Sequence, residues 1–177
     1  MLIEDVEDIE RYRPGGYRPL QIGDKLNNGR YQVVDKLGYG GYSTTWLARD
    51  LRNATYVALK VATADSSEGM HDGSLLQSLA TSSSRYGLGV LGAGTVPALL
   101  DEFWVAGPNG RHRCIATKPA QMSLLDAKEA SVFGLFQPGI ARSIIAQLIC
   151  GVAFLHSRDI VHGGMLTVHW GKLLRLT

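Results

Sequence analysis

The sequence predicts an α+β fold in which an antiparallel sheet precedes a group of helices. Three observations lead to this prediction: strand patterns separated by short turns begin at Tyr31, a hairpin pattern occupies 98–118, and a long helical pattern begins at Pro138. Because strands and helices are segregated along the chain rather than alternating, the order favours an antiparallel sheet over parallel βαβ units. We expect five strands with one helix among them, followed by helices alone.

The first three predicted strands form a meander. A β-branched and aromatic strand begins at Tyr31, a glycine cluster follows it, and a second strand lies around Thr44 to Ala48. The polar turn RNAT leads into a third strand, YVALKVAT. The fourth and fifth strands flank the sequence GPNG, which is a good hairpin signal. Residues 62–74, between the third strand and the next helix, are polar and predicted to be flexible.

Three segments are predicted to be helical. SLLQSLA forms a short helix before the hairpin, and LLDAKEA forms another after it. The segment 138–156 has apolar residues at three- and four-residue spacing and a proline near its first turn. The predicted organisation is an extended leader at 1–30, a sheet lobe at 31–120 and a helical segment at 121–177.

Composition and charge exclude several classes of protein. A length of 177 residues suggests one domain or slightly more, and 18 basic against 16 acidic residues give no electrostatic reason to expect nucleic acid or an anionic membrane as partner. The acidic opening MLIEDVEDIE argues against a secretory signal, and no uninterrupted apolar run approaches the roughly 18 residues of a membrane span. With two cysteines only, we expect a reducing compartment, in the cytoplasm, the nucleus or both.

The glycine cluster in LGYGGYSTTW places Gly38 and Gly40 at the bend of a strand–turn–strand hairpin. A phosphate chain under such a hairpin must approach backbone N–H groups closely, and side chains at these positions would obstruct it. Lys60 lies inside the apolar strand VALK, where a lysine is costly unless its ammonium has an anionic partner. The alternative interpretation is a lysine that extends from an edge strand into solvent. Together, hairpin and lysine match the glycine-rich loop and third-strand lysine of protein kinases.

A second glycine motif, GLGVLG, has the spacing of a dinucleotide-binding fingerprint at Gly87, Gly89 and Gly92. Such a site needs a strand before the glycines and a helix after them. Here serines precede the motif, while Pro97 and a predicted strand follow it. We therefore interpret this segment as a loop.

Taken together, the motifs resemble those of the eukaryotic protein kinases, and specifically the SR-protein kinases, notably their fungal members. The resemblance extends from about Glu7 to His162, and its segments are EDIERYRPGGYRPLQIGD, GRYQVVDKLGYGGYSTTWLARD, YVALKV, LLDEFWVAGPNGRHRCIATKPA and AQLICGVAFLHSRDIVHG. It implies a protein-kinase-like fold with an ATP-binding N-lobe at 31–120 and the truncated start of a helical C-lobe at 121–177. It also implies ATP with Mg²⁺, serine/threonine phosphorylation, and arginine-serine-rich splicing factors as substrates.

The resemblance further implies an ATP site, residue by residue. Gly38, Gly40 and Ser43 would cover the phosphates, and Lys60 would reach the α and β groups. Asp72 takes the place of the glutamate that normally holds this lysine, and is one methylene shorter. Thr45 stands where a valine usually packs on adenine, and Lys118 where the hinge often has glutamate. The full implied set is Leu37, Gly38, Tyr39, Gly40, Gly41, Tyr42, Ser43, Thr45, Ala58, Lys60, Asp72, Lys118 and Ala120.

The segment HGGMLTVHWGKLLRLT at 162–177 contains no aspartate, glutamate or asparagine. In one register Gly164 takes the place of the family's catalytic aspartate. In the other, residues 164–166 are an insertion, Thr167 stands at the aspartate and Lys172 at a metal-binding asparagine. Either register replaces the general base, whose removal typically costs about 10²–10⁴ in rate, and a Mg²⁺ ligand. We therefore expect no intact catalytic residue and no metal ligand here.

The position of the chain end adds to this expectation. The family's Asp-Phe-Gly segment, and the partners that would cover the helix at 138–156, would lie beyond Thr177. Six large apolar side chains on that helix, each worth roughly 1.5–3 kcal/mol on burial, would then lack cover. An uncovered patch of this kind implies a protein partner, self-association or poor folding. Three alternatives remain open: a sequence cut short or misspliced near 164, a pseudokinase interaction module, and the first part of an active kinase.

Overall fold

The computed structural model describes residues 7–81, 92–120 and 124–160 of the chain. The chain divides into two compact units. The first unit comprises Met1–Leu75 and Leu99–Pro119, and the second comprises Leu76–Ala98 and Ala120–Thr177.

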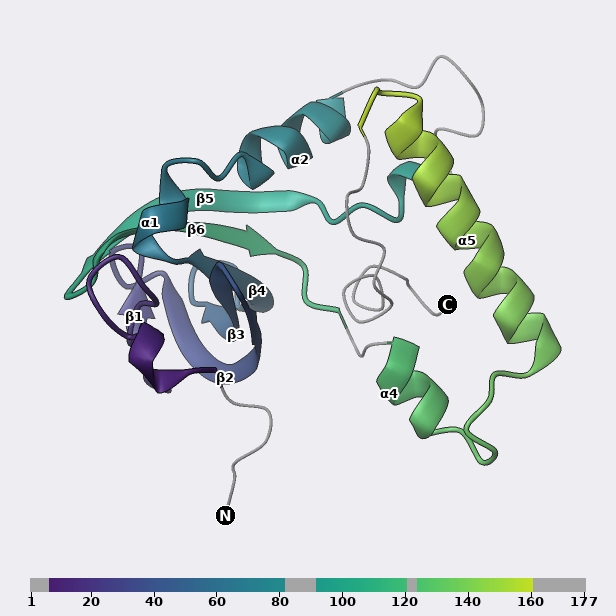
Figure 1. Cartoon of the computed structure of the whole chain (residues 1–177), viewed down its shortest axis with the longest axis horizontal. Helices are drawn as coiled ribbons and strands as arrows, with labels where there is room; N and C mark the ends of the chain where they lie inside the picture. Colours follow the sequence, from purple (N-terminus) through teal and green to yellow (C-terminus); the bar gives the residue numbers. More distant parts are fainter. Residues whose placement is uncertain (1–6, 82–91, 121–123, 161–177) are drawn as a thin grey trace. The chain divides into compact units, whose positions relative to one another are not determined.

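The first unit contains a six-stranded sheet with the order β1-β2-β3-β4-β6-β5, in which all neighbouring strands are antiparallel (Figure 1). Strands β2 to β6 are the five that the sequence predicts, and the leader adds the short strand β1. The bounds are β1 Lys25–Leu26, β2 Tyr31–Gly40, β3 Ser43–Asp50, β4 Thr55–Ala62, β5 Leu99–Gly107 and β6 Gly110–Thr117.

Helix α1 (Ala64–Ser67), which was not predicted, follows β4 and precedes the predicted helix α2 (Asp72–Thr81). Helix α1 falls in the segment expected to be flexible. Ser67 explains the difference, because its hydroxyl donates to the carbonyl of Thr63 at 2.7 Å and accepts the Arg113 backbone N–H of β6 at 2.9 Å. A polar sequence therefore forms a short helix that is bonded to the sheet.

A hydrophobic core fills one face of the sheet. Alternate residues of each strand point into it, as expected for strands with one buried face. Tyr31 and Phe103 stack within it, with ring centroids 5.4 Å apart. The buried members are Leu26, Tyr31, Val33, Trp46, Ala48, Val57, Leu59, Val61, Phe103, Cys114 and Ala116.

The predicted leader is part of the first unit over its described residues. It begins with a short 3₁₀ helix, η1 (Ile9–Arg11), and the side chain of Tyr17 is buried. The amide of Gly15 donates to the Asn109 carbonyl in the β5–β6 turn at 2.8 Å. A proline- and glycine-rich composition thus produces a tight turn packed on the sheet.

An ion-pair network joins the start of β2 to the β3–β4 turn and to β5. Arg30 contacts the carboxylates of Asp50 and Asp101, each at 2.8 Å, and Tyr31 donates to Asp101 at 2.9 Å. The hydrogen bond from Arg30 lowers the pKa of Asp50 to about 2, although burial of the carboxylate acts in the opposite direction. The network holds the end of the sheet that lies far from the glycine hairpin.

Over residues 124–160, the second unit contains helices α4 (Leu124–Glu129) and α5 (Pro138–His156), as predicted. Pro138 lies in the first turn of α5, where a missing backbone N–H has no cost. Length and composition would let α5 cross a membrane, but one such helix is weak evidence because core helices of soluble proteins pass the same test.

Some of the apolar side chains of α5 are buried and others are exposed. This corrects the expectation that all six large apolar side chains of the helix are uncovered. Ile144 and Leu155 are each 7% exposed, whereas Ile145 and Ile149 are 54% and 62% exposed. Leu155 belongs to a small cluster within the second unit, which consists of Leu79, Phe154 and Leu155 with Val96, Leu148, Val152 and Ile160 packed against them.

Candidate nucleotide-binding site

Strand register places several predicted site residues in a row across the sheet. Gly38 of β2 pairs with Thr45 of β3, Thr45 pairs with Lys60 of β4, and Lys60 pairs with Ile115 of β6. Residues paired across strands project from the same face of a sheet. We call this face, opposite the hydrophobic core, the site face. A second row on the same face, next to the row of Lys60, consists of Leu47, Ala58 and Thr117.

The opposite orientation of adjacent residues explains why a lysine is tolerated in the apolar strand β4. Leu59 and Val61 point into the core and are 0% and 1% exposed, whereas the side chain of Lys60 is 43% exposed on the site face. Strand β4 lies between β3 and β6 in the sheet. The alternative interpretation of Lys60 as an edge-strand lysine is therefore wrong.

Lys60 has an anionic partner on α2. Its ammonium nitrogen lies 2.6 Å from Oδ2 of Asp72, so the shorter aspartate side chain does reach the lysine. The two side chains are 43% and 45% exposed. An ion pair this exposed typically contributes only about 0–1 kcal/mol to stability. Its main physical effect is to hold the lysine ammonium above the site face.

Close packing at the start of α2 brings Asp72 within reach. A β-carbon added at Gly73 would overlap the carboxylate of Glu102 on β5. That carboxylate forms an ion pair with Arg113 of β6, and Arg113 also donates to the carbonyl of Met70, just before the helix. Gly73 therefore allows the start of α2 to approach the sheet.

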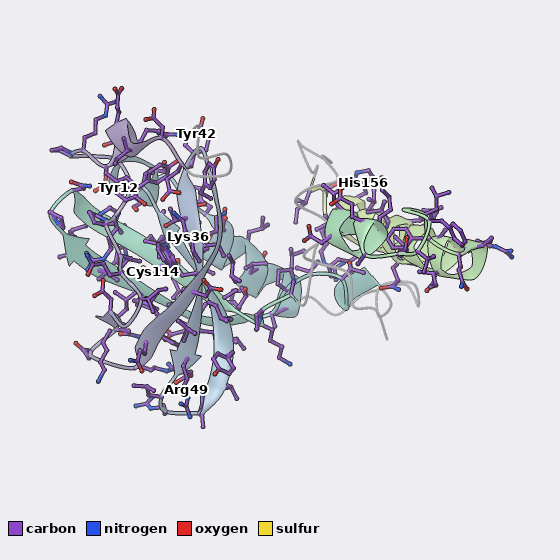
Figure 2. The ribbon with its side chains drawn as sticks, turned by 90° about the horizontal axis from the view of Figure 1, so that it is seen from below. Tyr12, Lys36, Tyr42, Arg49, Cys114 and His156 are labelled. Carbon is purple, nitrogen blue, oxygen red and sulfur yellow. The ribbon has the colours of Figure 1, made fainter. Side chains whose placement is uncertain are left out.

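The hairpin between β2 and β3 keeps the open geometry expected of a phosphate-covering loop. Gly38 has a φ of 150°, which residues with a side chain rarely adopt. A β-carbon added at Gly40 would meet no protein atom within 4 Å, so the protein itself leaves space at this position. Tyr42 is 75% exposed, and Figure 2 shows it at one end of the first unit, with Arg49 at the opposite end.

The carbonyl groups of the hairpin tip, by contrast, are occupied. The carbonyl of Gly40 accepts the hydroxyl of Tyr17 at 2.8 Å, and that of Gly41 accepts the guanidinium of Arg11. The carbonyl of Tyr42 accepts the amide of Thr63 at 2.9 Å. The tip is thus bonded to the leader and to the residue that follows β4.

Other residues predicted for the site lie outside this row across the sheet. Leu37 precedes Gly38 in β2, and Lys118 follows β6 and is exposed. Ala120 belongs to the second unit. Gly164 and Thr167, the two candidate positions for the catalytic base, lie outside the described residues.

The described residues do not provide a metal site. Within 7–81, 92–120 and 124–160, no group of three or more His, Cys, Asp or Glu side chains is arranged to hold a metal ion. Magnesium, which the resemblance implies, therefore has no fitting set of ligands among these residues.

Comparison with known proteins gives the family context. No protein-family profile matches the chain. The chain is 34% identical over 163 residues to serine/threonine-protein kinase SKY1 of Saccharomyces cerevisiae, covering 88% of this chain and 21% of that protein. It is 35% identical over 164 residues to SRSF protein kinase 3 of Mus musculus, covering 90% and 28%. Protein kinase dsk1 of Schizosaccharomyces pombe is 34% identical over 162 residues, covering 88% and 29%. This chain is related to the SR-protein kinases.

The relationship confirms the family resemblance seen in the motifs, although the chain spans less than a third of the length of these three relatives. A crystal structure of a kinase domain superposes with a TM-score of 0.68 at 15% identity, covering 86% of this chain and 42% of that one. At this level of identity the likeness concerns the fold alone. It confirms the predicted α+β, protein-kinase-like architecture.

Sequence reasoning missed the residues that position the site. Arg11 and Tyr17 bond the hairpin tip, and Glu102 and Arg113 hold the start of α2. For the leader, a signal was present in RYRPGGYR, where arginines and tyrosines flank a proline-glycine turn. For Glu102 and Arg113 the signal was weaker, because their pairing depends on strand register.

Proposed function

We propose that this chain binds ATP on the site face under the β2–β3 hairpin, as the nucleotide-binding lobe of a protein related to the serine/threonine kinases. The observation that carries the proposal is the 2.6 Å contact between Lys60 and Asp72. The Lys60 side chain lies on a central strand, is 43% exposed and is in a row with the glycine hairpin. An ammonium held in place is a suitable partner for a phosphate chain, because charge-assisted hydrogen bonds are the strong ones.

The surrounding residues suit the other parts of the nucleotide. The open space at Gly40 would admit phosphate oxygens close to the backbone. Ala58, in the row next to Lys60, is small and would leave room for a flat base against the sheet. Lys118, directly after β6, would lie near the edge of that base.

For the whole protein, the family implies magnesium-dependent phosphorylation of serines in arginine-serine-rich splicing proteins, and we propose this activity and these partners by relationship only. For the 177-residue chain we propose that no phosphate is transferred. Neither Gly164 nor Thr167 is an effective general base, and Lys172 cannot hold a divalent cation.

A second candidate function is a non-catalytic module that binds a protein through α5. Its specific support is the exposure of Ile145 and Ile149, which are 54% and 62% exposed one helical turn apart. This candidate predicts no requirement for nucleotide.

Equilibrium binding of labelled ATP to the chain, with and without magnesium, tests the proposal and separates the two candidates. We expect saturable binding in the micromolar to millimolar range, weakened by excess unlabelled ATP. A chain that binds no ATP under either condition favours the interaction module. An arginine-serine peptide offered with ATP should gain phosphate only at background level, and turnover abolished by Lys60→Ala would contradict the proposed inactivity.

A further inference from the structure

We propose that the leader acts as a clamp on the glycine hairpin, with Arg11 and Tyr17 as positioning residues that hold the hairpin tip ready for the phosphates of ATP. The inference rests on the proposed nucleotide binding. It assigns a role in that binding to a segment outside the sheet.

The clamp meets the hairpin through two side chains on adjacent carbonyls. The Tyr17 hydroxyl donates to the Gly40 carbonyl at 2.8 Å, and the Arg11 guanidinium donates to the Gly41 carbonyl. The guanidinium also lies over the Tyr17 ring, 4.9 Å from its centroid. Tyr17 is only 2% exposed, so its hydroxyl is held in a packed environment. Figure 2 shows Tyr12, next to Arg11 in the chain, at the same end of the first unit as Tyr42 of the hairpin.

The base of the clamp is attached to other parts of the first unit. The Asn109 side chain, in the β5–β6 turn, donates to the Tyr17 carbonyl at 2.6 Å. The amides of Ala64 and Asp65, at the start of α1, donate to the carbonyls of Gly16 and Gly15 at 3.1 and 2.8 Å. The hairpin tip is therefore bonded to a segment that is itself fixed at two separate places.

The leader sequence is suited to this geometry. A β-carbon added at Gly16 would overlap the backbone carbonyl of Arg11, so only glycine lets the chain turn back on itself here. This turn places Arg11 and Tyr17 side by side. The Pro-Gly-Gly sequence thus determines where the two positioning side chains meet the hairpin.

Holding the tip has a physical consequence for binding. A glycine-rich turn has high conformational freedom when unbound, and ordering it on binding costs affinity. Two hydrogen bonds from a fixed segment remove part of that freedom beforehand. Because the tip is the part of the hairpin proposed to cover the phosphates, the effect of the clamp should be seen in ligands with phosphates and be absent in ligands without them.

Tyr17→Phe in the full chain tests the clamp, because it removes one hydroxyl without changing charge or ring packing. Tyr56→Phe is the control, since Tyr56 pairs with Arg49 at the end of the sheet opposite the hairpin (Figure 2). Two quantities are measured in each variant: amide hydrogen exchange of residues 38–43 without ligand, and the dissociation constants of ATP and adenosine. Arg11→Gln provides a second variant for the neighbouring carbonyl.

We expect Tyr17→Phe to speed exchange at the tip by about two- to tenfold, the range that the loss of one hydrogen bond allows. ATP affinity should fall by a similar factor while adenosine affinity stays the same, and Tyr56→Phe should change neither quantity. Unchanged exchange at 38–43 in both Tyr17→Phe and Arg11→Gln would overturn the clamp, as would an equal loss of ATP and adenosine affinity. If the wild-type chain binds no ATP, the proposed function fails, and the exchange measurement still decides whether the leader holds the hairpin.

Discussion

The ammonium of Lys60 lies 2.6 Å from the carboxylate of Asp72, although aspartate is one methylene shorter than the glutamate that related kinases are expected to use. The missing length is supplied by the position of α2. Gly73 leaves no side chain between the helix and Glu102, so the start of the helix lies close to the sheet. The short aspartate thus reaches Lys60 because Gly73 lets the start of α2 approach the sheet.

Asp72→Asn should weaken ATP binding by roughly fivefold, or about 1 kcal/mol, because the lysine ammonium loses its charged partner and becomes mobile. The free energy of unfolding should change by less than about 1 kcal/mol, since the pair is half exposed. Calorimetric titration with ATP and urea unfolding measure the two quantities. A large loss of stability with unchanged ATP affinity would assign the pair a structural role instead.

Gly73→Ala should also weaken ATP binding severalfold, although alanine favours the helix by up to about 1 kcal/mol. The added methyl group competes with the Glu102 carboxylate and displaces the start of α2. Gly69→Ala is the matched control, because an added β-carbon there meets no atom within 4 Å. ATP affinity equal to wild type in Gly73→Ala would mean that Glu102 moves aside and that the close packing is unimportant.

Much of the fold was predictable because its signals are local. Strand patterns, the GPNG turn and the apolar spacing after Pro138 each depend on residues near one another in sequence, and each led to the observed element. The packing of the leader and the position of helix α1 depend instead on bonds to distant residues such as Asn109 and Arg113. No local pattern reports such bonds.

Stability of the sheet should depend on acid through Asp50. Its folded-state pKa of about 2 lies below that of an ordinary aspartate, so the stabilisation is complete above about pH 4 and is lost as the pH falls towards 2. Asp50→Asn should unfold more easily at neutral pH and show a shallower decrease over this range. Chemical unfolding at several pH values measures this dependence. Glu68→Gln, which changes an exposed carboxylate, should behave like wild type, and an unaltered slope in Asp50→Asn would refute the assignment.

The hydrophobic core should respond as a well-packed interior does. Leu59→Ala should destabilise the chain by about 2–5 kcal/mol, because Leu59 is fully buried between strands and its removal leaves a cavity. Leu100→Ala on β5 makes the same change at a side chain that is 44% exposed and should have a much smaller effect. Urea unfolding of both variants provides the comparison. Equal destabilisation would contradict the assigned faces of the sheet.

The candidate site was predictable to a different degree at each residue. Gly40 and Lys60 follow from motif spacing, and Asp72 follows from a count along the predicted helix. The Glu102–Arg113 pair could not be predicted, because it depends on the register of β5 against β6. The exposed position of Lys60 on a central strand required the strand order, which pairs β4 with β6 rather than with β5.

The central claim is that Lys60 holds the phosphates of ATP, and titration of ATP into the wild-type chain and Lys60→Met side by side tests it most directly. A charge-assisted hydrogen bond worth about 1.5–3 kcal/mol predicts a loss of affinity of roughly 10- to 150-fold in the variant, with adenosine binding unchanged. If Lys60→Met binds ATP as tightly as the wild-type chain does, the site face is not the phosphate site and the account is wrong.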